Sequence, residues 1–172
     1  MVYISHYESP LGGITLAHDG RQLTGLWFDG QKYFGSTIAG SVFKEPEKTG
    51  SSVFTEAERW LDEYFEGKEP DFVPPLKLQG TEFQKAVWKI LMTIPFGETR
   101  TYGEIAEKLA GELGLKSMSA QAVGGAVGHN PISLIVPCHR IIGASGSLTG
   151  YAGGIDKKQM LLQLELKGIK TA

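Results

Sequence analysis

The N-terminal part of the chain alternates short apolar segments with turn signals. Residues 2–8, 13–18 and 22–28 have the length and apolar content of strands. Between them lie the segment Pro10-Leu11-Gly12-Gly13 and the pair Asp19-Gly20, and Asp-Gly is typical of a hairpin turn. The pattern therefore predicts a small three-stranded antiparallel sheet.

A helical spacing of apolar residues follows the predicted sheet. The positions that share one helical face are Phe54, Ala57, Trp60, Leu61, Tyr64 and Phe65. Ser51 or Ser52 is placed to cap this helix, and Gly67 is placed to end it. We expect the helix to pack on the sheet with its aromatic rings in the core, and we expect no catalytic residue in this part of the chain.

A proline-rich segment from Glu69 to Pro75 interrupts the pattern of strands and helices. Such segments are typical of linkers, because proline ends regular structure. The sequence therefore predicts an N-terminal α/β domain at residues 1–78 and a second domain at residues 79–172.

Three helices are predicted in the next fifty residues. Thr81-x-x-Gln84 and Thr101-x-x-Glu104 are capping boxes that mark the starts of two of them. The first helix should end by Pro95 and carries a buried stripe of Phe83, Val87, Ile90, Leu91 and Ile94. The second should be short, with Ile105, Ala106 and Leu109 directed inward and a break at Gly111 and Gly114. The third should run from Ser119 to about Val127.

The second and third of these helices have the layout of a helix-turn-helix, in which the second helix faces DNA. Its outward side chains are expected to be small: Ala120, Ala122, Gly124, Gly125 and Ala126. A glycine inside a helix costs about 1 kcal/mol relative to alanine, so a compensating gain is needed. Close approach of either DNA or another helix would supply it. Long side chains that read bases are scarce here, so we expect little sequence preference.

The C-terminal segment combines a glycine–serine loop with a last helix. Residues 143–147 read as a wing or hairpin tip. The helix is predicted from Asp156 to Lys167, with Gly168 closing it. Its inward residues are expected to be Met160, Leu161 and Leu164.

Composition and charge are those of a globular protein without a membrane segment. Apolar residues make up 41% of the chain and charged residues 21%, and the apolar runs fall far short of a membrane span. The N-terminus lacks the basic and apolar regions of a secretory signal. Residues 1–79 hold 7 basic and 12 acidic side chains, whereas residues 80–172 hold 10 and 7. This excess of positive charge permits DNA binding by the second half but is too small to establish it.

Cys138 is the only cysteine of the chain and lies between an apolar segment and two basic residues, His139 and Arg140. A single unpaired cysteine is typical of a reducing cytoplasm, where we expect the protein to act. Most free cysteines are inert buried side chains, but a neighbouring imidazole and guanidinium favour the nucleophilic thiolate. Adjacent residues on a strand point to opposite faces, so a water relay between Cys138 and His139 is expected rather than direct contact.

Pro137-Cys138-His139-Arg140 resembles the active-site signature of the O6-alkylguanine-DNA alkyltransferases. The resemblance continues without a gap from residues 122–126, through Asn130-Pro131 and Gly150-Tyr151-Ala152-Gly153-Gly154, to Glu165. A weaker similarity covers residues 81–109, and the N-terminal part resembles the family in layout. The family implies an α+β fold: a small N-terminal antiparallel sheet with a helix, RNase H-like, followed by a mostly helical, winged helix-turn-helix-like domain.

The resemblance also implies roles in the reaction. Cys138 would attack the alkyl carbon of O6-alkylguanine, with O4-alkylthymine as a further candidate substrate, after the nucleotide is flipped out of the duplex. His139 would take the thiol proton through a water, held by Glu165, as in a catalytic triad. Tyr102 would donate a proton to N3 of guanine and help to rotate the nucleotide. Lys158 would favour the thiolate. Taken singly, Tyr102 could be a core aromatic, and an exposed helix face is the favoured interpretation for Glu165 and Lys158; at the family spacing from Cys138, function is favoured for all three.

The remaining implied positions contact the substrate or the DNA. Asn130 would tie the recognition helix to the active-site strand, Tyr151 would wall the base pocket, and the backbone near Ile141 and Ala152 would read the base edges. The other such positions are Arg140, Gly153, Ala122 and Gly125. Gln121 stands where the family usually has an arginine that fills the gap left by the flipped base, so weaker DNA affinity or slower flipping is expected. Lys116 is a candidate to compensate.

The expected partner is double-stranded DNA containing O6-alkylguanine, bound by a monomer that uses no cofactor. Some relatives carry zinc in the N-terminal domain, but this chain lacks the cysteines for it. The main alternative is a lesion sensor that binds alkylated DNA without repairing it, although sensors of that class lack the cysteine. A thiol hydrolase would need an oxyanion hole that the sequence does not show, and a plain transcription regulator leaves Cys138 unexplained.

Overall fold

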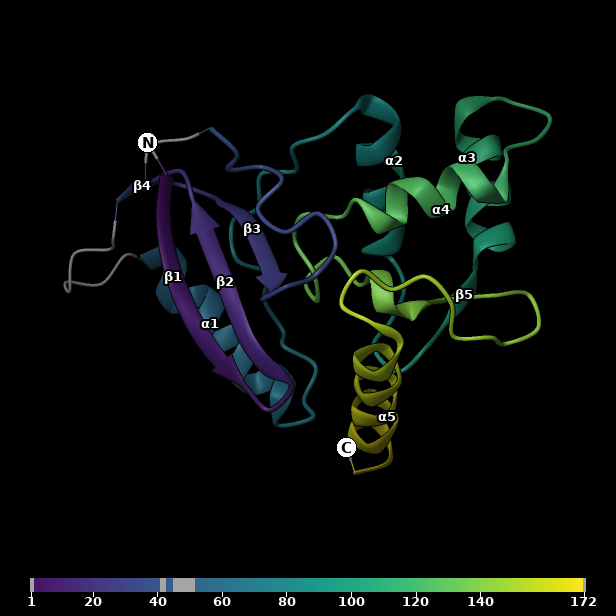
Figure 1. Ribbon diagram of the computed structural model, residues 1–172. Coiled ribbons are helices and arrows are strands. Elements are labelled where there is room, and N and C mark those ends of the chain that lie inside the picture. The colour runs from purple at the N-terminus through teal and green to yellow at the C-terminus, as the bar shows by residue number, and fades with distance from the viewer. Residues whose placement is uncertain (1, 41–42, 45–51, 172) are drawn as a thin grey trace.

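The computed structural model describes residues 2–40, 43–44 and 52–171. The N-terminal half is a mixed sheet with one helix against it (Figure 1). Strands β1 (Val2–Ser9), β2 (Gly12–His18) and β3 (Leu23–Phe28) form the predicted antiparallel sheet. A two-residue strand that the sequence did not reveal, β4 (Phe43–Lys44), pairs parallel with β1 and gives the order β3-β2-β1-β4.

Helix α1 (Ser52–Phe65) packs on this sheet as predicted, and the turn after it places Gly67 at a φ of 83°. Its buried residues are Val53, Phe54, Ala57, Trp60, Leu61 and Tyr64. Ser52 is the first residue of the helix, whereas Ser51, the other predicted cap, lies outside the described residues. Every residue of β3 is buried, because the second face of the sheet is also covered, around Trp27 and Ile38.

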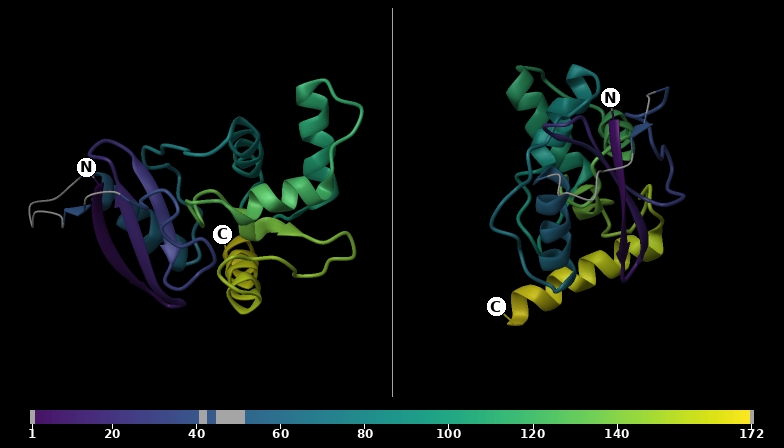
Figure 2. Two further views of the ribbon diagram at one scale, coloured as in Figure 1. Left: turned by 45° about the horizontal axis from the view of Figure 1, so that its top comes forward. Right: turned by 90° about the vertical axis from the view of Figure 1, so that its left-hand side faces the viewer.

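The C-terminal half contains four helices among the described residues. They are α2 (Glu82–Leu91), α3 (Tyr102–Leu113), α4 (Ala120–Gly128) and α5 (Ile155–Thr171). Two short strands, β5 (Arg100–Thr101) and β6 (Ile141–Ile142), pair in parallel beside them. Figure 2 shows α5 below the α2–α4 group, running past the N-terminal half. None of the described helices is long and apolar enough to cross a membrane.

The helix starts follow the predicted caps. Thr81 and Gln84 form a complete capping box at α2. Thr101 accepts a hydrogen bond from the Glu104 backbone N–H at α3, but the Glu104 side chain bonds the threonine hydroxyl instead of the backbone, so that box is half formed. Ser119 caps α4 through the Ala122 N–H.

Several details of the predicted helices were wrong. Helix α3 continues through Gly111 and ends at Gly114, which adopts the left-handed conformation at a φ of 68°. Helix α5 continues past Gly168 to Thr171, and its Met160 is exposed rather than inward. Ala126 on α4 is buried rather than outward, because α4 packs on α2 at this face. Its carbonyl accepts a hydrogen bond from the indole of Trp88, a buried residue missed in the predicted α2 stripe.

The two halves share one core and are joined by backbone hydrogen bonds. The Leu26 N–H donates to the Pro131 carbonyl at 2.9 Å, and the Ser133 N–H donates to the Leu26 carbonyl at 2.9 Å. The segment after α4 is therefore attached to β3. A single apolar cluster includes residues of α1, β2, β3 and the C-terminal helices. This attachment positions the segment that leads to Cys138.

Candidate active site

The segment from Asn130 to Cys138 is a chain of tight turns, not the predicted strand. Cys138 begins a 3₁₀ helix, η1 (Cys138–Arg140), and Leu134 has a φ of 69°. A left-handed leucine costs roughly 1–2 kcal/mol and persists only where surrounding contacts hold it. Asn130 supplies two of them: its amide donates to the Val136 carbonyl at 2.8 Å, and its carbonyl oxygen accepts from the Ile132 N–H at 3.0 Å.

The Cys138 thiol is buried, with 5% of the residue exposed. Burial raises the pKa of the Cys138 thiol, while a hydrogen bond from Asn130 and the charge of Lys158 act in the opposite direction. The raised pKa keeps the resting thiol protonated at neutral pH. A base is therefore needed to form the thiolate when the reaction occurs.

His139 and Glu165 form a fully buried pair next to the thiol. The Nε2 atom of His139 contacts the Oε2 atom of Glu165. Burial lowers the pKa of His139, against the opposing effect of Glu165. Nδ1 of His139 has no hydrogen-bond partner among the described residues. With Nε2–H held by the carboxylate, Nδ1 carries the lone pair and is the nitrogen that can accept a proton.

The Glu165 carboxylate accepts four hydrogen bonds. Besides His139, Oε2 accepts from the Tyr64 hydroxyl at 2.7 Å, and Oε1 accepts from the Gly97 N–H at 2.9 Å and from Nε of Arg140 at 2.8 Å. Burial alone would raise the pKa of Glu165, but His139, the Arg140 charge and the Gly97 hydrogen bond together lower it to about 2. The carboxylate is therefore anionic at neutral pH and fixed in orientation.

Arg140 lies inward, with 8% of the residue exposed. Besides Glu165, it donates from Nη1 to the Ile94 carbonyl at 2.7 Å, and its guanidinium lies over the Phe96 ring. The structure thus places Arg140 beside Glu165, with its Nε and Nη1 atoms hydrogen-bonded inside the protein. Ile141 is fully buried and pairs with Arg100 in the small parallel ladder.

Tyr102 and Lys158 meet at one acceptor, the Thr149 carbonyl. The Tyr102 hydroxyl donates to it at 3.1 Å and Nζ of Lys158 donates at 3.0 Å. Tyr102 is the first residue of α3 and half-buried, whereas Lys158 on α5 is completely buried. Burial lowers the pKa of Lys158, and the Cys138 thiolate would raise it.

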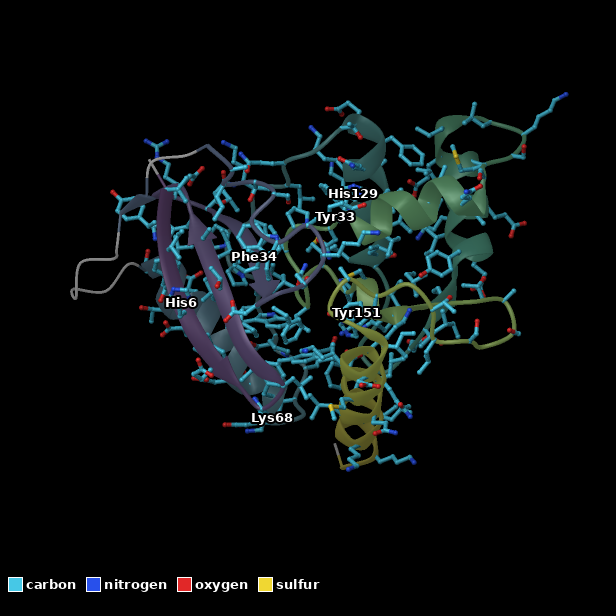
Figure 3. All side chains as sticks on the ribbon, in the orientation of Figure 1. His6, Tyr33, Phe34, Lys68, His129 and Tyr151 are labelled. Atoms are coloured by element: carbon cyan, nitrogen blue, oxygen red, sulfur yellow. The ribbon has the colours of Figure 1, made fainter. Side chains whose placement is uncertain are left out.

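A cavity of about 370 Å³ opens beside the site, within the range of small-ligand pockets. Its lining combines both halves of the chain: Lys32, Tyr33, Gly124, Gly125, Gly128, His129, Gly150, Tyr151 and Ala152. The Tyr33 ring stacks on His129 at 3.9 Å between centroids, and Figure 3 shows the two at the end of α4, away from Tyr151 on the loop before α5.

Tyr151 is buried, with its ring centroid 6.5 Å from that of His139. Gly153 has no room for a side chain, because a Cβ would lie 2.8 Å from the Tyr151 ring.

Two family models cover nearly all of the chain. Residues 2–78 match the ribonuclease-like domain of 6-O-methylguanine DNA methyltransferase, and residues 82–167 match its DNA binding domain. The chain belongs to the 6-O-methylguanine DNA methyltransferase family.

Relatives in this family match over almost their whole length. A methylated-DNA–protein-cysteine methyltransferase of Methanosarcina mazei is 53% identical over 98% of this chain and 100% of its own. That of Mycobacterium bovis is 47% identical over 96% and 93%. The crystal structure of Mycobacterium tuberculosis OGT in complex with DNA is 44% identical, covers 96% of this chain and 94% of its own, and has a TM-score of 0.82.

The candidate site brings together most of the residues that the sequence singled out. Cys138, His139, Glu165 and Lys158 come together in the buried centre, and Tyr102 and Tyr151 line its edge. Gln121 and Ala122 lie apart from them, exposed on the first turn of α4. Among the described residues, no group of three or more His, Cys, Asp or Glu side chains is placed to hold a metal ion.

Sequence reasoning did not connect Tyr64 with the candidate site. It was assigned to the core on helical spacing, which is correct for its ring. Its hydroxyl, however, reaches a carboxylate 101 residues later in the chain. The available signal was that a buried tyrosine normally needs a hydrogen-bond partner.

Proposed function

We infer that this protein repairs DNA by direct reversal, transferring the methyl group of O6-methylguanine irreversibly to its own Cys138. The observation that carries this inference is a lone buried cysteine adjoining a buried His139–Glu165 pair, within the family signature. Double-stranded DNA with O6-alkylguanine is the partner. The action is single-use, because a thioether is not reversed by any group in the site.

The transfer step is a displacement at the methyl carbon. The bond from Sγ of Cys138 to that carbon forms as the bond from carbon to O6 of guanine breaks, and the electron pair stays on guanine. The thiol proton passes through a water to Nδ1 of His139, whose Nε2–H is held by Glu165. Tyr102 supplies the proton that guanine takes at N3 and regains one from solvent, while His139 releases the thiol proton to solvent, so that one proton leaves the thiol and one reaches the leaving group. The positive charge of Lys158 stabilises the thiolate.

The proposed DNA-binding surface is the exposed face of α4 and the adjacent cavity. Apart from the neighbouring residues and the backbone of the helix itself, no described atom lies within 4 Å of a Cβ built on Gly125 or Gly128, so these glycines are not explained by packing against other parts of the protein. Their cost of about 1 kcal/mol each is offset if a DNA groove approaches the helix closely. The flipped base would enter the cavity against Tyr151 and the backbone of Ala152.

We propose that Gln121 contacts the space left by the flipped base. It is exposed at the start of α4, as is Lys116 before it. A glutamine brings hydrogen bonds but no charge, so we propose weaker DNA affinity than an arginine would give. A cytoplasmic location completes the proposal, supported by the single unpaired thiol.

The decisive experiment mixes the protein with duplex DNA that carries one O6-methylguanine and measures intact protein mass, with Cys138→Ala as the control. We expect one hydrogen to be replaced by one methyl group, on Cys138 alone, saturating at one per molecule. Tight lesion binding without a mass gain would indicate a sensor. If the protein neither binds the lesion nor gains mass, the methyltransferase and the sensor are both rejected. A thiol hydrolase would then be tested.

A further inference from the structure

Glu165 is held by both halves of the chain. Three of its four donors, on His139, Arg140 and Gly97, belong to the C-terminal half, whereas the fourth, Tyr64, lies at the end of α1. We propose that Tyr64 is a positioning residue for methyl transfer: its hydroxyl fixes Glu165 and sets how tightly His139 holds the proton taken from Cys138. This inference rests on the proposed function.

The geometry gives Tyr64 little freedom. Its hydroxyl lies 2.7 Å from Oε2 of Glu165 and 3.3 Å from Nε2 of His139, and the residue is completely buried. The ring stacks on Trp60 at 5.2 Å between centroids and meets Phe96 edge-on at 6.1 Å. A ring packed in this way cannot turn its hydroxyl away from the carboxylate.

The Tyr64 hydroxyl stays protonated and therefore always acts as a hydrogen-bond donor. Burial and the adjacent Glu165 charge raise the pKa of Tyr64 well above its usual range, so the group stays neutral. It donates to the same carboxylate oxygen that His139 contacts. A donor at that oxygen withdraws negative charge from it, which weakens its hold on an imidazolium. Removing the hydroxyl should therefore strengthen the attraction between Glu165 and protonated His139.

The other charged and titratable groups around His139 stay in place when the Tyr64 hydroxyl is removed. Arg140 of η1 and Lys158 of α5 lower the pKa of His139, and Glu165 of α5 raises it. Cys138 precedes His139 in the chain, and the Tyr151 ring faces it edge-on. The change in proton affinity can thus be assigned to the lost hydroxyl.

The test is the pH dependence of methyl transfer in a single turnover, compared between the native protein and Tyr64→Phe. The acidic limb of the rate profile is the pH range in which protonation of His139 slows the reaction. Losing a hydrogen bond to a charged group should shift the midpoint of this limb to higher pH by roughly half to one pH unit. Affinity for the lesion DNA should stay unchanged. Tyr7→Phe is the matched control, because Tyr7 also donates to a carboxylate, that of Asp62 on α1, away from the site. An acidic limb that moves in neither variant would overturn the inference.

A second measurement separates this inference from the proposed function. The His139 imidazole is titrated by NMR without DNA, and its pKa should be higher in Tyr64→Phe than in the native protein. If the native protein transfers no methyl group, the proposed function fails. If it transfers normally and both the rate profile and the titration are unchanged, the role of Tyr64 fails.

Should Tyr64→Phe fail to fold, fluorotyrosine at position 64 preserves the shape of the side chain. Its more acidic hydroxyl donates more strongly to Glu165, so the acidic limb should move downward. An unchanged limb would reject the proposed role.

Discussion

Two glycine-to-alanine substitutions should change stability in opposite directions because of what surrounds them. A Cβ built on Gly168 of α5 would lie 2.1 Å from the Gly67 carbonyl oxygen and 3.0 Å from the Phe96 ring. A Cβ built on Gly111, inside α3, would meet no described atom within 4 Å apart from the neighbouring residues and the backbone of the helix itself. Neither of the two has a positive φ, so backbone conformation is not the difference.

The magnitudes follow from packing and helix propensity. Alanine in a helix interior is favoured over glycine by up to about 1 kcal/mol. Overpacking costs about 1–3 kcal/mol, and the Gly67 carbonyl is backbone that cannot rotate away, which favours the upper end of that range. We expect Gly168→Ala to lose about 2 kcal/mol and Gly111→Ala to gain about 0.5–1 kcal/mol.

Thermal unfolding monitored by circular dichroism tests the pair. In a chain of 172 residues, 1 kcal/mol corresponds to about 2–4 °C in Tm. Gly168→Ala should therefore lower Tm by about 4–8 °C, and Gly111→Ala should raise it by about 1–4 °C. Equal shifts, or stabilisation by both, would refute the conclusion that α5 contacts the Gly67 turn without space for a methyl group.

Two further predictions concern charge in the site. Lys158→Gln should raise the pKa of Cys138 further, because the nearby cation favours the thiolate. The pH profile of thiol alkylation by iodoacetamide measures this change, and Lys157→Gln is the control that should match the native protein. Glu165 has its pKa lowered from 4.5 to about 2 in the fold, so its contribution to stability is complete above about pH 4.5 and is lost as the pH falls toward 2. When acid unfolding is followed by fluorescence, stability should accordingly fall less steeply with decreasing pH in Glu165→Gln than in the native protein. Equal slopes would contradict the lowered pKa of Glu165.

Local signals in the sequence were sufficient for most of the fold. The Thr81 capping box and the Asp19-Gly20 turn depend on residues a few positions apart, and both elements form where predicted. The strand β4 was missed because it has two residues and pairs with β1 across the sheet. The end of α5 was misplaced because Gly168 was read as a stop, whereas the position requires a glycine for contact with Gly67.

The site was predicted less completely than the fold. The motif and its spacing identified Cys138, His139 and Glu165, and the structure brings the last two into contact. The predicted strand at Cys138 was wrong, because the apolar run before it indicates a strand, whereas Leu134 adopts a positive φ in a turn and Asn130 holds the segment through hydrogen bonds to Ile132 and Val136. The domain boundary at residue 78 and the individual catalytic roles stay predictions.

The shared acceptor at Thr149 has an evolutionary consequence. Tyr102 and Lys158 both bond its main-chain oxygen, and the threonine itself is exposed. Any amino acid at position 149 would offer that oxygen, so the side chain there is free to drift while the course of the backbone is not. Selection would act on the length and turns of the loop that precedes it. A position can thus be essential to the site and still look variable when homologous sequences are compared.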